Sequence, residues 1–304
     1  MDSMSDFRAG FVAVIGRPNT GKSTLVNALV GNKVVITSPH PNTTRNSIRG
    51  IVSKDEYQII LVDTPGIHKP KTALGTRLNS MAIENIESTD SIVICLPANE
   101  EIGLGDEFIF KQIKTKVPIF IVVTKIDLIS KLELAIKLTK VNELIQRLKI
   151  NQVEIIPVSA KIEEQIELLL DLLSKSLPIS PALYPEDITS DQAQEFLFAD
   201  LIREAAIEEL YEELPHSVIV TIDEMGKRDG AEIFDVVASL HVERESQKGI
   251  LIGPSGSKLK SIGIRARKSL EDQVSMQVFL QLHVKVSKDW QKDPKQLAKL
   301  GFIE

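Results

Sequence analysis

The chain has 304 residues, of which 43% are hydrophobic and 26% are charged, and its formal net charge is −6. This length favours two domains over one, and the composition is typical of a folded globular protein, which argues against a disordered or fibrous chain. No apolar run approaches the length of a membrane span, and we expect no signal peptide because acidic residues precede the first apolar run.

The first part of the sequence alternates apolar, strand-like runs with amphipathic segments. This pattern predicts strands at 11–15, 48–53, 57–62, 91–96, 118–123 and 153–158, and helices at 22–30, 72–88, 105–115, 132–149 and 163–176. Only three residues separate the second and third strands, which predicts an antiparallel hairpin, whereas helices separate the others and predict right-handed crossovers. Residues 1–176 should therefore form a doubly wound α/β domain with a mostly parallel six-stranded sheet.

Residues 177–187 contain three prolines and have no helical period, so they are interpreted as an interdomain linker. Residues 188–304 are expected to form a smaller α+β domain. Its first helix should begin with a cap at Thr189 or Ser190 and run to about Leu214. Strands at 218–222, 233–242 and 276–286 and helices at 257–273 and 294–300 are expected to follow.

The most specific motif is a phosphate-binding loop that stands between the first strand and the first helix. The predicted nucleotide-contacting residues in this loop are Gly16, Arg17, Pro18, Asn19, Thr20, Gly21, Lys22, Ser23 and Thr24. Its backbone N–H groups and the helix N-terminus are suited to a di- or triphosphate. Lys22 should reach the outer phosphates, and the Ser23 hydroxyl should bind Mg²⁺. The alternative is an ordinary glycine-rich turn, which the strand–loop–helix context argues against.

Two further segments are placed to act on the γ-phosphate and its metal. Asp63 ends a predicted strand and can hold Mg²⁺, and Gly66 can bring its N–H close to the γ-phosphate because it has no side chain. In the polar loop 39–45, Thr44, with Thr43 as second choice, can close over the γ-phosphate and the metal. On composition alone this loop could equally be solvated and without a role.

Two other strand ends are expected to bind the base. Asp127 can accept hydrogen bonds from the N1 and exocyclic amine of guanine, a donor pair that adenine lacks, and the Lys125 stem can pack beside the base. Thr124 precedes them, and Ser159, Ala160 and Lys161 follow the next strand, where backbone N–H groups could reach guanine O6. An ATPase is a weaker interpretation because Asp127 favours guanine.

In these motifs the sequence resembles the Era family of bacterial GTPases over nearly its whole length. The resemblance extends to residues 63–70, the linker segment 183–185, the Ile252–Gly256 turn and the stretches 262–267 and 284–290. It implies a GTPase domain joined to a type II KH domain. It also implies that Asn19, with backbone of the 37–44 loop, holds K⁺ near the β/γ bridge.

The chain departs from the family at Thr124 and at Pro254–Ser255, and from many small GTPases outside the family at Ile67. Thr124 stands where the family usually has Asn, which weakens the expected grip on guanine. Ile67 follows Gly66 where many small GTPases have a water-orienting Gln, so we expect slow intrinsic turnover. Pro254 and Ser255 stand inside a turn that commonly carries Lys, so one phosphate contact is expected to be missing.

The C-terminal domain is the candidate RNA-binding part. Residues 248–299 carry 11 Lys or Arg and 4 Asp or Glu, a net charge of +7 that leaves −13 on the rest of the chain. The GxxG turn of KH modules brings backbone and a helix N-terminus against a nucleic-acid backbone. The predicted RNA-contacting residues are Gly253, Pro254, Ser255, Gly256, Lys258, Lys260, Arg265, Arg267, Lys268 and Trp290. A solvated helix face and a core tryptophan are the alternatives.

Taken with the resemblance, these features predict a Mg²⁺-dependent GTPase that hydrolyses GTP to GDP and phosphate. Its catalytic residues would be Lys22, Thr44, Gly66 and Asn19. The resemblance implies that it binds the 3′ end of small-subunit (16S) rRNA and assists assembly of the 30S subunit. We expect a cytoplasmic monomer with peripheral contact to the inner face of the cell membrane; the single Cys95 excludes an internal disulfide and fits this setting. The alternative is a GTP-gated adaptor whose C-terminal domain binds protein or acidic lipid.

Overall fold

The computed structural model describes residues 7–37, 48–67, 73–114, 116–210 and 218–288. The chain divides into two compact units, residues 1–191 and 192–304. The strands of the first unit are β1 (Arg8–Ile15), β2 (Ile48–Lys54), β3 (Tyr57–Asp63), β4 (Ser91–Pro97), β5 (Ile119–Thr124) and β6 (Val153–Pro157). Its α-helices are α1 (Lys22–Val30), α2 (Ala73–Glu87), α3 (Leu104–Gln112), α4 (Lys131–Leu148) and α5 (Ile166–Ser176), and η1 (Ile126–Leu128) is a single 3₁₀ turn.

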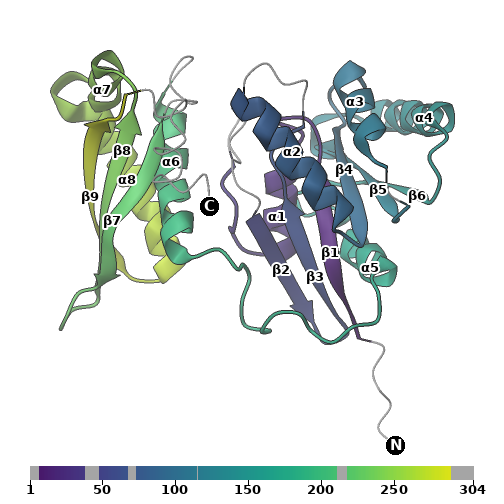
Figure 1. The fold of residues 1–304 in the computed structure, drawn as a ribbon, viewed down its shortest axis with the longest axis horizontal. Helices are drawn as coiled ribbons and strands as arrows, with labels where there is room; N and C mark the ends of the chain where they lie inside the picture. Colours follow the sequence, from purple (N-terminus) through teal and green to yellow (C-terminus); the bar gives the residue numbers. More distant parts are fainter. Residues whose placement is uncertain (1–6, 38–47, 68–72, 115, 211–217, 289–304) are drawn as a thin grey trace, which may run out of the picture. The chain divides into compact units, whose positions relative to one another are not determined.

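The first unit is a three-layer structure around one sheet of six strands, in the order β2-β3-β1-β4-β5-β6 (Figure 1). Only β2 runs antiparallel to its neighbour, β3. Helices α1 and α5 bury Leu25 and Leu169 on one face, whereas α2, α3 and α4 bury residues such as Ile109 and Val141 on the other. This arrangement confirms the predicted doubly wound fold. The strands could be recognised in the sequence because strands covered on both faces are apolar throughout.

The second unit packs two helices on a three-stranded sheet. Its elements are α6 (Gln194–Glu209), β7 (Ile219–Lys227), β8 (Ile233–Val242), α7 (Glu245–Ile252), η2 (Pro254–Gly256), α8 (Ser257–Val274) and β9 (Gln277–Val286). The strand order is β7-β8-β9, with β7 antiparallel and β9 parallel to β8. Buried residues of α6 and α8, among them Phe198 and Ile262, supply its core. Among the helices of the described residues, none combines the length and apolar character that crossing a bilayer requires.

The start of α6 differs from the prediction. Thr189 and Ser190 do not cap the helix, which begins at Gln194 after Ala193. Their backbone instead pairs with the outer strand β2: Ile51 N donates to Thr189 O at 2.8 Å, and Ser190 forms a bridge with Gly50. Strand pairing satisfies the backbone groups that a helix cap would have used. Helix α7 was not predicted, and the predicted helix at 294–300 lies outside the described residues.

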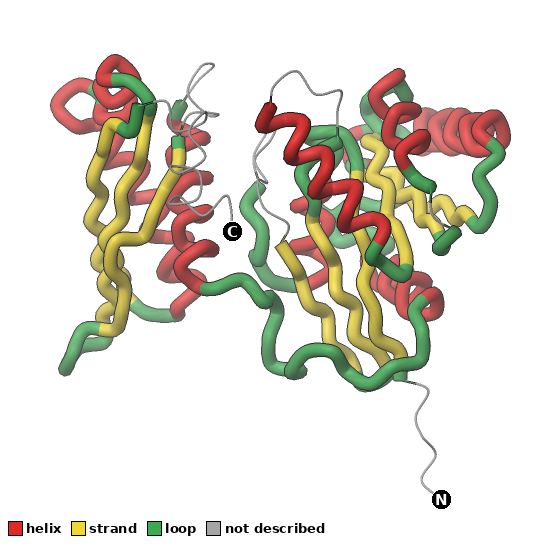
Figure 2. The backbone as a smooth tube through the Cα atoms, viewed as in Figure 1, coloured by secondary structure: helices red, strands yellow, loops and turns green. Residues whose placement is uncertain are grey.

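The segment predicted as a linker lies against the first unit. Ala9 N donates to Pro178 O at 3.2 Å, and Ser180 N donates to Phe7 O at 3.0 Å. Figure 2 shows this segment as an irregular path from α5 past the lower end of the sheet. The predicted linker, residues 177–187, is therefore held against the first unit at its start by backbone pairing, and residues 189 and 190 pair with β2 just beyond its end.

Candidate nucleotide site and nucleic-acid interface

The phosphate-binding loop lies between the last residue of β1 and the start of α1. Asn19 and Gly21 have φ values of 64° and 90°, so the loop turns through the left-handed region just before the helix. At Gly16, a Cβ would lie 2.7 Å from Thr20 Oγ1 and 2.9 Å from Cys95 O, which leaves room only for glycine. The loop therefore presents its backbone and the first turn of α1 at the carboxyl ends of the strands, where anions can bind.

Lys22 is the first residue of α1, and its side chain is only 6% exposed. Its Nζ donates to Arg17 O at 2.8 Å, so the ammonium lies over the loop. Burial lowers the pKa of Lys22, and the nearby Asp63 carboxylate partly offsets this. A phosphate group bound in the loop would favour the charged form.

Asp63, the last residue of β3, is fully buried and accepts a hydrogen bond from Ser23 Oγ at 2.9 Å. A hydroxyl and a carboxylate side by side are the hard oxygen donors that Mg²⁺ prefers, so the donor set fits this metal. The next residue, Thr64, donates its hydroxyl to Val14 O at 2.9 Å, which fixes the start of the Asp63–Gly66 turn against β1.

The turn after β3 packs directly on the phosphate loop. A Cβ on Gly66 would lie 2.8 Å from Pro18 N, so only glycine permits this approach. The next amide, Ile67 N, donates to Gly16 O at 3.1 Å. The Ile67 side chain is fully buried in the core beneath α2, where it has no contact with water.

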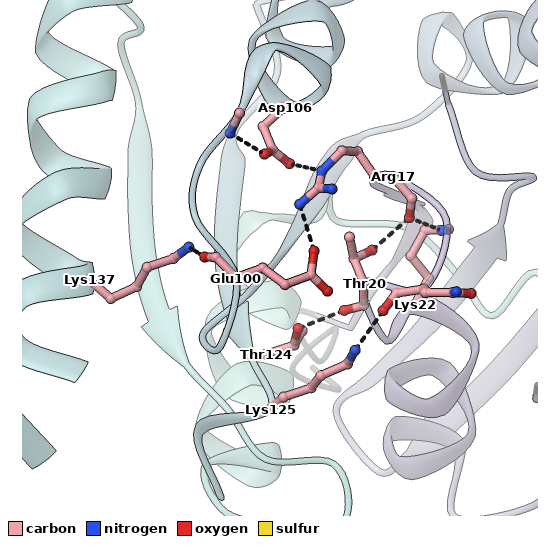
Figure 3. A network of polar contacts seen from close by, with 10 residues as sticks. Arg17, Thr20, Lys22, Glu100, Asp106, Thr124, Lys125 and Lys137 are labelled. Carbon is pink, nitrogen blue, oxygen red and sulfur yellow. Dashed lines mark hydrogen bonds and ion pairs between the residues drawn. The ribbon is translucent and has the colours of Figure 1, made fainter. Parts of the chain in front are cut away.

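The end of β5 is clasped to the phosphate loop by two hydrogen bonds (Figure 3). Thr124 Oγ1 donates to Thr20 O at 2.6 Å, and Lys125 Nζ donates to Asn19 O at 2.7 Å. Asp127, in the turn η1, is exposed, and its Oδ1 accepts from Ser159 Oγ at 2.6 Å. That bond orients the carboxylate and joins the two segments predicted to bind guanine.

The structure thus gathers most of the predicted nucleotide residues at the carboxyl ends of β1, β3, β5 and β6. Thr24 is exposed on α1, and Ala160 and Lys161 directly follow the buried Ser159. Thr43 and Thr44 lie outside the described residues. Sequence patterns did not predict Asp106 and Glu100, which bind Arg17 at 2.7 and 3.0 Å, because 89 and 83 residues separate them from it.

The GxxG turn of the second unit connects α7 to α8. Gly253, Ser255 and Gly256 all have positive φ, at 72°, 50° and 78°. A Cβ on Gly253 would lie 2.8 Å from Lys258 Cγ, so the turn lies close to the first residues of α8. Pro254 and Ser255 are exposed at its tip. Such a turn presents backbone and a helix N-terminus to a phosphodiester chain.

The basic residues of α8 differ in their surroundings. Lys260, Arg267 and Lys268 are exposed, and Lys258 is half-buried beside the turn. Arg265 is paired with two acids of α6, Glu208 at 3.1 Å and Glu209 at 3.3 Å. The positive charge of Arg265 is therefore partly neutralised within the protein. Trp290 lies outside the described residues.

Comparison with known proteins shows the family. Residues 11–125 match the family described as 50S ribosome-binding GTPase, and residues 213–291 match the KH domain family. GTPase Era of Mycobacterium tuberculosis is 50% identical over 304 residues, which cover 98% of this chain and all of that protein. The chain belongs to the GTPase Era family.

Two solved structures of this family share the fold of the whole chain. One is a point variant of Era from Aquifex aeolicus bound to GDP and AlF₄⁻, with 34% identity and a TM-score of 0.91. The other is Era in complex with MgGDPNP and nucleotides 1506–1542 of 16S ribosomal RNA, with 36% identity and a TM-score of 0.91. Each match covers 98% of this chain and 100% of that chain. The predicted family and GTPase activity are confirmed: the chain binds GTP and GDP and hydrolyses GTP.

Proposed function

We propose that the chain uses its nucleotide state to control binding of the 3′ end of 16S rRNA during assembly of the 30S subunit. One observation carries this proposal: an Era structure that matches the chain over 98% of its length contains MgGDPNP and nucleotides 1506–1542 of 16S rRNA together. The exposed GxxG turn and the basic residues of α8 support it, because they offer a backbone cradle and counter-charge for RNA phosphates. In functional terms, residues 1–176 are the GTPase domain and 177–187 the linker, and RNA binding belongs to the second unit, which begins at residue 192 because residues 189 and 190 pair with β2.

Each nucleotide residue has a role within this proposal. Lys22 binds the outer phosphates, and Ser23 and Asp63 hold Mg²⁺, which neutralises phosphate charge when it is bound. The Gly66 N–H contacts the γ-phosphate, and Thr44 closes over it. Asp127, oriented by Ser159, binds the guanine N1 and amine protons. Backbone groups of the loop contact the phosphates, and backbone groups that follow β6 contact the base. The loop residues are Arg17, Pro18, Thr20, Gly21 and Thr24, and those at the base are Ala160 and Lys161.

Hydrolysis in this proposal depends on positioning and charge stabilisation rather than on a covalent intermediate. Ile67 cannot orient water, since its side chain is apolar and buried, so intrinsic turnover is slow. Asn19 holds K⁺ beside the β/γ bridge, where the cation offsets developing charge. Hydrolysis faster in KCl than in NaCl at equal ionic strength would support this role, and equal rates would contradict it.

The RNA proposal is tested by filter binding. A 16S 3′-end oligonucleotide and a scrambled control are each titrated with protein in MgGDPNP and in MgGDP, over a series of KCl concentrations. We expect tighter binding of the 3′-end sequence in one nucleotide state, with affinity that falls as salt rises. Equal affinity for both oligonucleotides would overturn the sequence assignment, and equal affinity in both nucleotide states would overturn the switch.

A second candidate function is a GTP-gated adaptor on the membrane surface, favoured by the exposed lysines and arginines of α8. Co-sedimentation of the protein with anionic vesicles, together with no measurable binding of RNA, would support this alternative. Binding to both would mean that the two functions coexist in one monomer.

A further inference from the structure

Arg17 is the second residue of the phosphate loop, and its side chain is anchored outside that loop. Its Nε donates to Asp106 Oδ1 at 2.7 Å, and its Nη2 donates to Glu100 Oε2 at 3.0 Å (Figure 3). Two charge-assisted hydrogen bonds from one guanidinium fix both the position and the plane of the group.

Asp106 is suited to be the fixed end of this pair. It is 1% exposed, and its second oxygen, Oδ2, accepts a hydrogen bond from Gly103 N at 2.9 Å at the start of α3. A Cβ on Gly105 would lie 2.7 Å from Arg17 Cδ, so the arginine stem lies directly against the first turn of this helix. The carboxylate is thus held at the start of α3 by a hydrogen bond that does not involve Arg17.

Glu100 is held in turn from α4. The buried Lys137 donates its Nζ to Glu100 O at 2.6 Å. The two acids that bind Arg17 therefore belong to a segment fixed by helices on one face of the sheet.

The backbone carbonyl of Arg17 connects this anchored side chain to residues of the phosphate loop. Its carbonyl oxygen accepts from Thr20 Oγ1 at 3.0 Å and from Lys22 Nζ at 2.8 Å. We propose that Asp106 is a positioning residue for phosphate binding, acting through Arg17, whose carbonyl sets the place of the Lys22 ammonium. Preorganised charge is worth most where the group need not move on binding.

The test uses variants that separate positioning from stability. Arg17→Gln leaves the buried Asp106 carboxylate without its cation, so we expect both a lower Tm and weaker GDP binding. Adding Asp106→Asn removes that charge and keeps an oxygen acceptor for Gly103 N. The double variant should therefore recover most of its Tm while its Kd for GDP, by calorimetry, stays about tenfold or more above wild type, as loss of a charged hydrogen bond implies.

A matched control removes another ion pair of α3. Arg147 Nη2 contacts Glu107 Oε1 at 2.6 Å, away from the phosphate loop, so Arg147→Gln should leave the Kd for GDP unchanged. The inference is overturned if GDP affinity recovers together with Tm in the double variant, or if Arg147→Gln weakens GDP binding equally. It rests on the role proposed for Lys22, which Lys22→Ala tests separately: wild-type GDP affinity in that variant would refute the lysine role itself.

Discussion

Position 124 shows how one hydroxyl can replace a larger side chain in joining two segments. A threonine has a single proton to donate, and Thr124 gives it to Thr20 O at 2.6 Å in a site where its own side chain is 5% exposed. The end of β5 is therefore braced against the phosphate loop, and this proton is no longer available for the base. We therefore expect guanine recognition to depend on Asp127.

This geometry makes Thr124→Val a sharp test at the residue scale. Valine keeps the shape but leaves the Thr20 carbonyl without its donor, which should cost about 1–3 kcal/mol in the free energy of unfolding. We expect weaker GDP binding as well, because the phosphate loop loses one of the two hydrogen bonds that join it to the end of β5. Urea denaturation and calorimetry measure the two effects. Thr124→Ser is the control and should remain close to wild type; a valine variant that matches wild type in both measurements would refute the brace.

Cys95 provides a second prediction at this scale, one that concerns pH. Burial raises the pKa of the Cys95 thiol to about 12, and the nearby Lys22 only partly opposes this. The thiolate is the reactive form, so below that pKa the folded protein holds the thiol protonated and out of reach. At pH 8 we expect no reaction with a disulfide reagent in the native state and one equivalent after denaturation. Fast labelling of the native protein would contradict the buried position in β4.

At the scale of the single element, the basic residues of helix α8 are of two kinds, those in ion pairs within the described residues and those exposed at the surface. Arg265 forms ion pairs with Glu208 and Glu209, whereas Arg267 and Lys268 are exposed. If α8 binds RNA, Arg267→Ala should lower affinity and reduce the salt slope by about 0.7, the value for one phosphate contact on a single strand. Arg265→Ala should change the slope less. Filter binding over a KCl series measures both, and a larger slope change for Arg265→Ala would show that the ion pairs open on binding.

The elements of the first unit could largely be predicted from sequence, for a physical reason. Its central strands are covered on both faces and so appear as unbroken apolar runs, and the motif residues follow directly where those strands end. What could not be predicted depends on partners distant in sequence. The Arg17–Asp106 pair joins residues 89 apart, and Thr189 pairs with β2 because that strand is the exposed edge of the sheet.

At the scale of the whole chain, residues 177–191 form a strap, by which we mean the segment that follows α5 and stays bonded to the first unit. Gln58, a fully buried residue of β3, holds its middle. Its Oε1 accepts from Leu183 N at 2.7 Å and Tyr184 N at 2.9 Å, and its Nε2 donates to Tyr184 O at 2.9 Å. One amide side chain thus satisfies three backbone groups of the strap, as a neighbouring strand would.

Gln58→Leu should release this strap while leaving the sheet intact. Leucine has a similar volume but offers no hydrogen bond, so three backbone groups near Tyr184 must turn to water or remain without partners, and each buried loss costs about 1–3 kcal/mol. We therefore expect a lower free energy of unfolding and faster limited proteolysis between residues 177 and 191, read by mass spectrometry.

The matched control is Arg49→Ala, which removes an exposed ion pair to Asp191 of 2.7 Å at the end of the same strap. That change should cost no more than about 1 kcal/mol, because exposed ion pairs are screened by water. Equal cleavage rates in wild type and Gln58→Leu would mean that the paired ends near Pro178 and Thr189 hold the strap without Gln58.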